Sequence, residues 1–324
     1  MSADLKARFD AFTRSQITSE GRSLEELKRS TDVLKGQESL RLRQFCANEC
    51  MEPGRDLDEF GRLLLSGSLQ DVKNDYAKRI SKYSNSTGAS SSSELTAEER
   101  VRDDYYSMRW GPTKVTLYNL LNLFTIIVPQ NYKSYMDMAR FFITEAKVPV
   151  DGQELSGTRA LSHAFSTKPS FNLELAQILY DAGGDVNARN RYGGTVAHEF
   201  IQLYQFHDRQ ICDRALKALE WFFSHGGNID IADSDGMTAR RMVDRLSKVG
   251  GATMRPIVLA VKNEDERRRK LGSKACKCCA RTKQDGLLAH CGRCKKVSYC
   301  YGPKKSCQKL DWPRHKAECK AGAQ

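Results

Sequence analysis

Cysteine is concentrated towards one end of this chain, and that concentration constrains the fold more than any other feature. Eight of the eleven cysteines lie between residues 276 and 319. Close pairs with two residues between them are typical of zinc sites, because the two thiolates can point at one ion. The regularly spaced donor residues are Cys276, Cys279, Cys291, Cys294, Cys300, Cys307, His315 and Cys319.

Eight donors make two complete four-coordinate sites, and thiolate with imidazole selects zinc. His315 and Cys319 are spaced to share one face of a helix, for which Asp311 is a suitable N-cap and Pro313 is tolerated in the first turn. An apolar core is the alternative, but few large apolar residues occur in this segment. A catalytic zinc would need an open coordination position. We therefore expect two structural zinc ions.

The spacing, together with the stretch CQKLDWPRHKAEC at 307–319, resembles the MYND-type zinc finger. The resemblance implies a cross-braced fold in which the first and third pairs share one ion and the second and fourth pairs share the other. The first zinc would then take Cys276, Cys279, Cys300 and Cys307. The second would take Cys291, Cys294, His315 and Cys319.

The third pair departs from the family pattern, since six residues separate Cys300 from Cys307 where the family usually has three. Cys307 is therefore the ligand that most needs a structural test. Cys278 is a spare thiol that could exchange with Cys279, and His290 beside Cys291 is an alternative donor, although a solvated histidine is expected.

Positive charge follows the cysteines. Residues 267–324 carry 17 Lys and Arg against 3 Asp and Glu, whereas the whole chain is +12, so residues 1–266 are slightly acidic. The run RRRK at 267–270 could be a nuclear localisation signal or a solvated surface. A basic tail would also attract phosphate, so a nucleic-acid-binding regulator is the alternative function.

Before the cysteine-rich segment, similar stretches recur, and GGDVNARNRYGGTVAH at 183–198 resembles the linker of ankyrin repeats. Each copy has a threonine that we expect to open a helix, and the apolar residues between copies recur at helical spacing. These threonines are Thr113, Thr158, Thr195 and Thr238. The predicted fold class is mainly α: an ankyrin-type helical repeat solenoid followed by a small cross-braced two-zinc finger.

The predicted domains follow from these patterns. We expect a helical N-terminal segment at 1–57, a divergent ankyrin-like repeat at 58–83 and a Ser-rich linker or loop at 84–94. The ankyrin-like array with its closing helix would span 105–271, and the MYND-type finger 272–324. No apolar run is long enough to span a membrane, and the N-terminus lacks a signal-peptide pattern, which favours a cytoplasmic or nuclear location.

No catalytic motif stands out, so we expect a binding protein rather than an enzyme. Both resemblances imply an adaptor for proteins or short, proline-containing peptides, with Gln308 and Trp312 lining a peptide groove in the finger. Packing against the zinc core is the alternative role of Trp312. In the array, exposed hairpin tips are the candidate contacts: Arg189, Asn190, Arg191, Tyr192, Asp233, Ser234 and Asp235.

Overall fold

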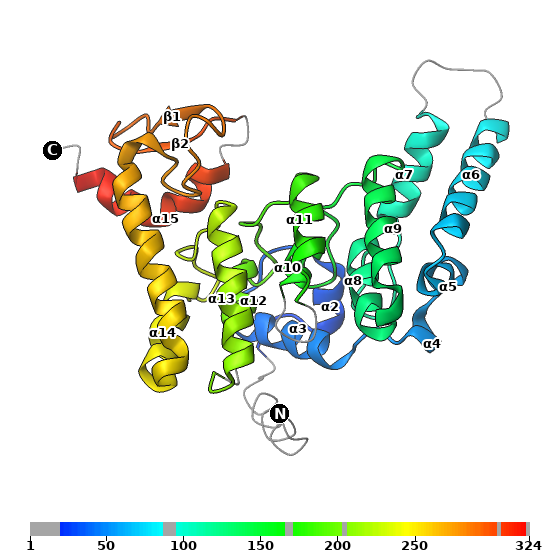
Figure 1. The fold of residues 1–324 in the computed structure, drawn as a ribbon, viewed down its shortest axis with the longest axis horizontal. Coiled ribbons are helices and arrows are strands. Elements are labelled where there is room, and N and C mark those ends of the chain that lie inside the picture. Colours follow the sequence, from blue (N-terminus) through cyan, green and yellow to red (C-terminus); the bar gives the residue numbers. More distant parts are fainter. Residues whose placement is uncertain (1–19, 87–94, 166–170, 203–205, 303–305, 322–324) are drawn as a thin grey trace. The chain divides into compact units, whose positions relative to one another are not determined.

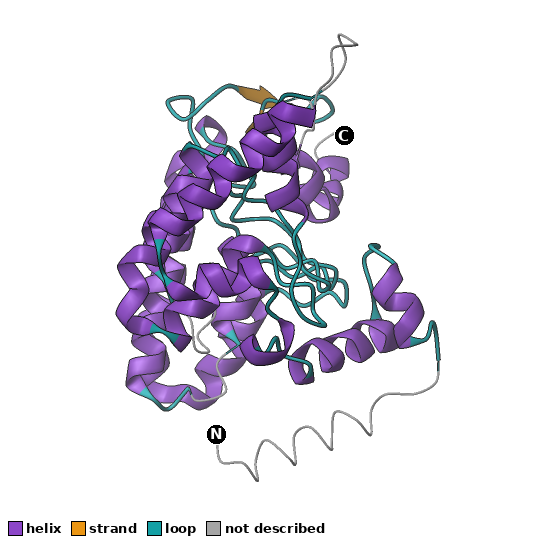
Figure 2. Ribbon diagram, turned by 90° about the vertical axis from the view of Figure 1, so that its right-hand side faces the viewer, coloured by secondary structure: helices purple, strands orange, loops and turns teal. Residues whose placement is uncertain are grey.

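The computed structural model describes residues 20–86, 95–165, 171–202, 206–302 and 306–321. The chain divides into two compact units, Met1–Val196 and Ala197–Gln324. Helices dominate, and the only paired strands in the described ranges are two short ones in the second unit (Figure 2). The predicted mainly α class is therefore confirmed. Across the same ranges, no helix combines the length and apolar character needed to cross a bilayer.

The first unit opens with three short helices, α2 (Leu24–Arg29), α3 (Gly36–Asn48) and α4 (Pro53–Asp56). A capping box starts α2, because Ser23 and Glu26 accept each other's backbone N–H groups. Leucines of this segment form a buried cluster with residues far along the chain: Leu27, Leu34, Leu42, Leu155 and Tyr192. The segment that follows residue 20 therefore packs onto the repeats. Residues 1–19 of the predicted N-terminal segment lie outside the described residues.

The predicted helix, turn and helix of residues 60–80 is present as α5 (Glu59–Ser66) and α6 (Leu69–Ser86), and α7 (Ala97–Ser107) follows. Gly67 ends α5 with a positive φ of 78°, which a glycine adopts without strain. An aromatic cluster holds this part together, since Tyr105 stacks on Phe60 at 5.1 Å and meets Phe142 edge-on at 5.2 Å. Residues 87–94 of the predicted Ser-rich linker are outside the described residues, and the domain boundaries remain predictions.

Between the aromatic cluster and the cysteine-rich segment, the chain repeats one pattern: a turn followed by a pair of helices. Each turn contains a glycine with positive φ, and three turns are closed by a short antiparallel bridge, as in Ala232 with Thr238. The turn glycines are Gly111, Gly157, Gly193 and Gly236. The helices between them are α8 (Leu117–Ile127), α9 (Tyr132–Thr144), α10 (Ala160–Ala164), α11 (Leu173–Asp181), α12 (Val196–Ile201) and α13 (Arg209–Ser224), with the 3-10 turn η1 at Pro129–Asn131. Neighbouring helices such as α8 and α9 lie side by side (Figure 1), which is the predicted ankyrin-type arrangement.

Of the four threonines predicted to open helices, only some lie at a helix start. Thr238 is an N-cap whose side chain accepts from the Arg241 N–H, and Thr195 directly precedes α12. The prediction for Thr113 is wrong, because that residue lies in the turn closed by Trp110 and Val115, and α8 begins only after Thr116. Thr158 likewise lies before the N-cap Arg159, and its hydroxyl bonds to Ser156.

The last helical element, α14 (Ala239–Leu271), is two helices joined at Gly251. This glycine has φ 53° and ψ −129°, which no helix contains, so residues 239–250 and 252–271 point in different directions. Pro256 lies inside the second helix, one turn after its start, and cannot donate to the carbonyl of Ala252. Together the two parts form the closing helix pair of the array.

The cysteine-rich segment has little regular structure except one helix. It contains η2 (Gly272–Lys274), the antiparallel strands β1 (Leu288–His290) and β2 (Ser298–Cys300), and α15 (Ser306–Ala321). The register pairs Leu288 with Cys300 and His290 with Ser298. The prediction that Asp311 caps the last helix is wrong, because α15 begins five residues earlier. Pro313 accordingly lies inside the helix.

Candidate metal centre and binding surfaces

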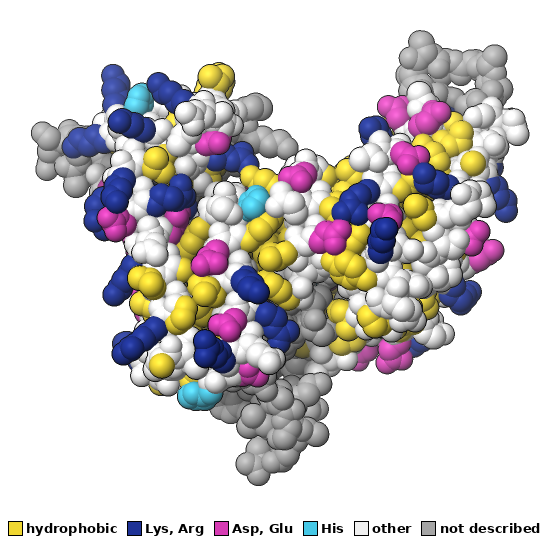
Figure 3. Space-filling model, viewed as in Figure 1, with side chains coloured by type: hydrophobic (Ala, Val, Ile, Leu, Met, Phe, Trp, Pro, Cys, Tyr) yellow, Lys and Arg dark blue, Asp and Glu magenta, His cyan; other side chains and the backbone are white. Residues whose placement is uncertain are grey.

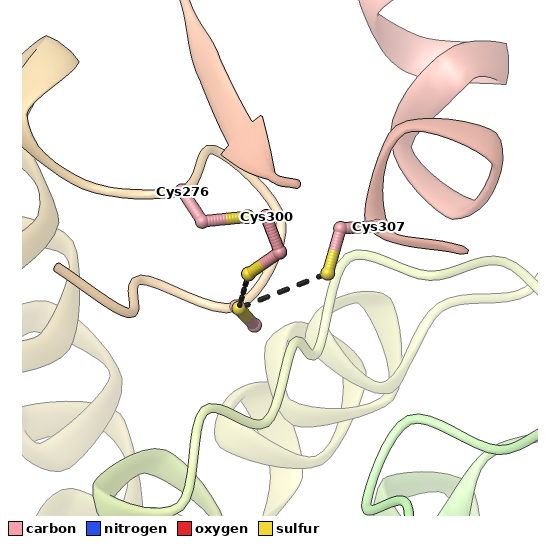
Figure 4. A group of neighbouring side chains, drawn as sticks. Cys276, Cys300 and Cys307 are labelled. Carbon is pink, nitrogen blue, oxygen red and sulfur yellow. Dashed lines mark hydrogen bonds between the residues drawn. The ribbon is translucent and has the colours of Figure 1, made fainter. Parts of the chain in front are cut away.

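Four cysteines from three separate parts of the finger converge on one point. The donor atoms of Cys276, Cys279, Cys300 and Cys307 all lie within 4.8 Å of one another. The sulfur of Cys279 is 3.4 Å from that of Cys300 and 3.8 Å from that of Cys307. Figure 4 shows the side chains of Cys276, Cys300 and Cys307 close together, with dashed lines from the sulfurs of Cys300 and Cys307 that meet at the sulfur of Cys279. The longer interval between Cys300 and Cys307 therefore does not keep Cys307 from the other three thiols.

Local backbone conformation places these donors. The first knuckle is a tight turn in which the Ala280 N–H donates to the Cys276 carbonyl at 2.8 Å, and Ala280 has a positive φ of 57°. Cys300 ends β2, and Cys307 lies in the first turn of α15. Three elements must therefore be in place before the four thiols can meet.

The second group joins Cys291, Cys294, His315 and Cys319, whose donor atoms also lie within 4.8 Å of one another. The Cys294 sulfur is 3.5 Å from Nε2 of His315, and the sulfurs of Cys291 and Cys319 are 4.0 Å apart. His315 and Cys319 lie one turn apart on α15, as the spacing predicts. The structure thus brings the eight predicted donors together in the same two groups that the family resemblance implies.

Asp311 supports the second group from inside the helix. Its side chain is buried and accepts a hydrogen bond of 2.7 Å from the hydroxyl of Tyr299 in β2. Tyr299 in turn packs edge-on against the His315 ring, with centroids 5.9 Å apart. Sequence reasoning placed Asp311 in a capping role, whereas the structure uses it to fasten α15 to the hairpin.

The chemistry of both groups fits zinc. Seven thiols and one imidazole supply two complete sets of four soft or borderline donors, which is the closed form of a structural zinc site. Burial alone would raise the pKa of Cys291, but the backbone N–H groups of Cys294 and Arg293 lower it to about 6. A thiolate is therefore available near neutral pH. Nδ1 of His315 is buried without a hydrogen-bond partner in the described chain and lies 3.8 Å from Glu318.

Two zinc ions fit these groups, and their expected contribution is stability. A structural site supplies roughly 10–16 kcal/mol of apparent binding free energy, which a segment with so small an apolar core needs. Cys278 and His290 belong to neither group. Nδ1 of His290 instead lies 3.2 Å from the Ser298 hydroxyl.

Comparison with known proteins agrees with this geometry. Residues 276–319 match the family model described as MYND finger. The chain carries a MYND finger. Over 44 residues the chain is 50% identical to the N-lysine methyltransferase SMYD2 of Rattus norvegicus and of Mus musculus, and over 46 residues it is 48% identical to SMYD2-A of Danio rerio. Each match covers 14% of this chain and 9% of the relative.

Among solved structures, an ankyrin repeat domain from Acinetobacter baumannii aligns with a TM-score of 0.35 and 17% identity. The alignment covers 57% of this chain and 94% of that one. The ankyrin-type character of the array rests on the turns, bridges and helix pairs described above.

The MYND finger is docked on the turn that precedes α14, which the sequence did not indicate. Arg268 of α14 donates to the Gly227 carbonyl at 2.6 Å and to the Cys278 carbonyl at 2.9 Å. The Asn228 amide donates to the buried sulfur of Cys278 at 3.8 Å. A Cβ on Gly226 would lie 2.9 Å from the Cys279 carbonyl oxygen, so the two backbones are in close contact. Arg268, part of the suspected localisation signal, therefore joins the finger to the array.

The predicted peptide-binding residues share one groove. Gln308 and Trp312 line a hollow of about 380 Å³ with Tyr299, Tyr301 and Arg293. Trp312 is half-buried and also faces the His315 ring at 6.1 Å, so its two proposed roles are compatible. Tyr301 is 71% exposed, which leaves an aromatic face open at the rim.

The prediction that the hairpin tip of the first unit is exposed is wrong for three residues, because Asn190, Arg191 and Tyr192 are buried. The Arg191 guanidinium donates to the carbonyls of Leu27, Asp32 and Leu155 and to the Ser30 hydroxyl, at 2.8–3.1 Å. The guanidinium of Arg43 stacks on the Tyr192 ring at 4.1 Å. The N-terminal segment therefore covers the turn that contains Arg191. The residues around this turn in the sequence give no indication of that contact. In the second unit, Asp235 is exposed and Asp233 and Ser234 are partly exposed.

Proposed function

We propose that this chain is a zinc-dependent adaptor whose MYND finger binds a short, proline-containing peptide. The observation that supports this proposal is that Gln308 and Trp312 line the same groove. Aromatic faces suit the flat, preorganised surface of a proline-rich segment, and the Gln308 amide can bond to a peptide backbone. The MYND finger and the ankyrin-type repeats together form a zinc-binding architecture of protein-interaction modules.

Binding rather than catalysis is the role we propose for the whole chain. The methyltransferases that it resembles are matched only over the finger, which is 9% of their length. The finger's donors come in complete sets of four, which suits structural zinc.

A peptide titration tests the groove. Fluorescence anisotropy with a library of labelled proline-containing peptides should find binders whose affinity falls about tenfold or more for Trp312→Ala, as expected for an aromatic anchor. Gln308→Ala should weaken the same peptides less. Lys316→Ala, an exposed position on the same helix, is the matched control. Zinc content must stay the same in all three variants, so that loss of the fold is not mistaken for loss of the groove.

Nucleic acid is the competing ligand. Two of the finger's cations are already paired, Arg314 with Asp230 and Lys277 with Glu318. We therefore expect random duplex DNA to bind weakly and with a steep salt dependence, whereas the peptide should resist salt. Tight binding of duplex that Trp312→Ala leaves intact, with no peptide bound, would contradict the proposal.

A further inference from the structure

The two helices of α14 enclose a groove that the finger does not cover. Its volume is about 600 Å³, and its lining comes from the end of the first helix and the start of the second. The residues that matter are Ser247, Met254, Arg255, Val258, Leu259 and Lys262. The sharp change of direction at Gly251 creates this hollow, since a continuous helix could not place Ser247 beside Val258.

The outer surface of this helix pair is more apolar than a closing repeat should be. In a repeat array each unit buries its apolar face on the next, and the terminal unit needs a polar outer face. Here Leu259 is 58% exposed and Val249, just before the break, is 60% exposed. Figure 3 shows apolar side chains with Lys and Arg around them over this part of the chain.

The charges that line the groove have one sign. Arg255 and Lys262 line it, and no acidic residue belongs to the lining. On the first helix, exposed Arg245 and Lys248 flank it together with one exposed carboxylate, Asp244. Neither Arg255 nor Lys262 takes part in an ion pair within the described chain. A second copy of this chain would bring the same cations to the contact, so self-association through this face is disfavoured.

We propose that this groove is a docking site for an acidic amphipathic helix of a partner protein. Apolar side chains at helical spacing would fill the space beside Met254, Val258 and Leu259. Aspartate or glutamate on either side of that stripe would pair with Arg255 and Lys262. The site shares no residue with the groove of Gln308 and Trp312, so it is independent of the function proposed for the finger.

Peptide selection tests the chemistry directly. A displayed library of random peptides of about 16 residues, long enough for about four helical turns, is selected on the zinc-loaded full chain. Binders to Leu259→Glu are removed by counter-selection. The surviving peptides should carry net negative charge and apolar residues three or four positions apart. In anisotropy titrations one such peptide should bind about tenfold more weakly to Leu259→Glu and to the double variant Arg255→Glu with Lys262→Glu.

The control is Leu287→Glu in the finger, where the leucine is 76% exposed, and it should leave binding unchanged. Protection of Lys262 from acetylation by the peptide gives a second readout on the unaltered chain, independent of how the variants fold. Three outcomes would overturn the proposal: survivors without negative charge, equal binding to the double variant Arg255→Glu with Lys262→Glu, or survivors that leave Lys262 unprotected. An empty selection together with Leu259-dependent binding of phosphatidylserine vesicles would overturn it in favour of a membrane surface.

Discussion

Arg314 of α15 and Asp230 of the turn before α14 form an ion pair, with Nη1 3.1 Å from Oδ2. The same aspartate bonds to Arg240 at 2.6 Å, and Arg240 also holds Asp265 at 2.7 Å. Burial would raise the pKa of Asp230, but the guanidinium groups of Arg240 and Arg314 lower it overall. The carboxylate therefore stays charged and ties the helix that carries His315 to the repeat array.

Breaking this pair should loosen the finger without unfolding it. We expect a double-mutant cycle of Asp230→Ala and Arg314→Ala to give a coupling of about 0.5–1 kcal/mol, because both groups are partly exposed. Hydrogen exchange at residues 226–231 measures the local opening. Lys283→Ala, at an exposed position of the finger, is the control and should leave this exchange unchanged. A coupling of zero would mean that the contact contributes nothing to docking.

Cys307 can be tested as a zinc ligand by counting metal. The purified chain should hold two zinc ions, and Cys307→Ser should reduce this to about one, since a set of three thiolates binds the ion less tightly. Mass spectrometry of the native protein gives the count. Cys278→Ser is the matched control, because this thiol neighbours the first group without belonging to it, and two ions should remain. Equal zinc content in both variants would exclude Cys307 as a ligand.

Removing Arg191 should release the N-terminal segment from the first unit. Arg191→Met removes the guanidinium that donates to the buried carbonyls of Leu27 and Leu155 and to the partly buried carbonyl of Asp32, so we expect a loss of roughly 2–4 kcal/mol. Limited proteolysis after residue 20 and urea unfolding both report this change. The control is Arg189→Met, two positions earlier, whose guanidinium bonds to the Gly193 carbonyl in its own turn. Similar losses in both variants would argue against a specific role for Arg191.

Acid should destabilise the N-terminal segment around Arg22 and Glu38. Hydrogen bonds from Arg22 lower the pKa of Glu38 to about 2, well below its unfolded value. A depressed carboxyl pKa stabilises the folded state above the unfolded value, and this stabilisation is lost as the pH falls towards about 2. Amide exchange at residues 24–42 should therefore accelerate relative to α9 between about pH 5 and 3. In Arg22→Gln this extra acid sensitivity should disappear, and its persistence would contradict the assignment.

Zinc-site geometry was predictable because its information is local in the sequence. Donor spacing and the pattern CQKLDWPRHKAEC indicate both groups, and the structure brings the same eight residues together. Asp311 shows the limit of such reasoning. Its side chain could cap a helix, but α15 begins at Ser306. The carboxylate instead accepts a hydrogen bond from the hydroxyl of Tyr299.

Arg191 could not be understood from its neighbours. Its residue type and its turn predict an exposed tip, whereas its partner Leu27 is 164 positions away. The docking of the finger could not be predicted from the sequence either, because the contacts of Arg268 with Gly227 and Cys278 depend on tertiary packing. Helix periodicity indicates which faces are apolar, but it does not say which distant segment covers them.

The burial of Arg191 against Leu27 also has a consequence for biosynthesis. Leu27, Leu34 and Leu42 leave the ribosome well before the surface that covers them is complete, because that surface includes residues near 192. At about 5–20 residues per second, that interval is roughly 10–30 s. During this time Leu27, Leu34 and Leu42 are exposed on an unfinished chain, which makes this segment the expected point of contact for molecular chaperones during translation.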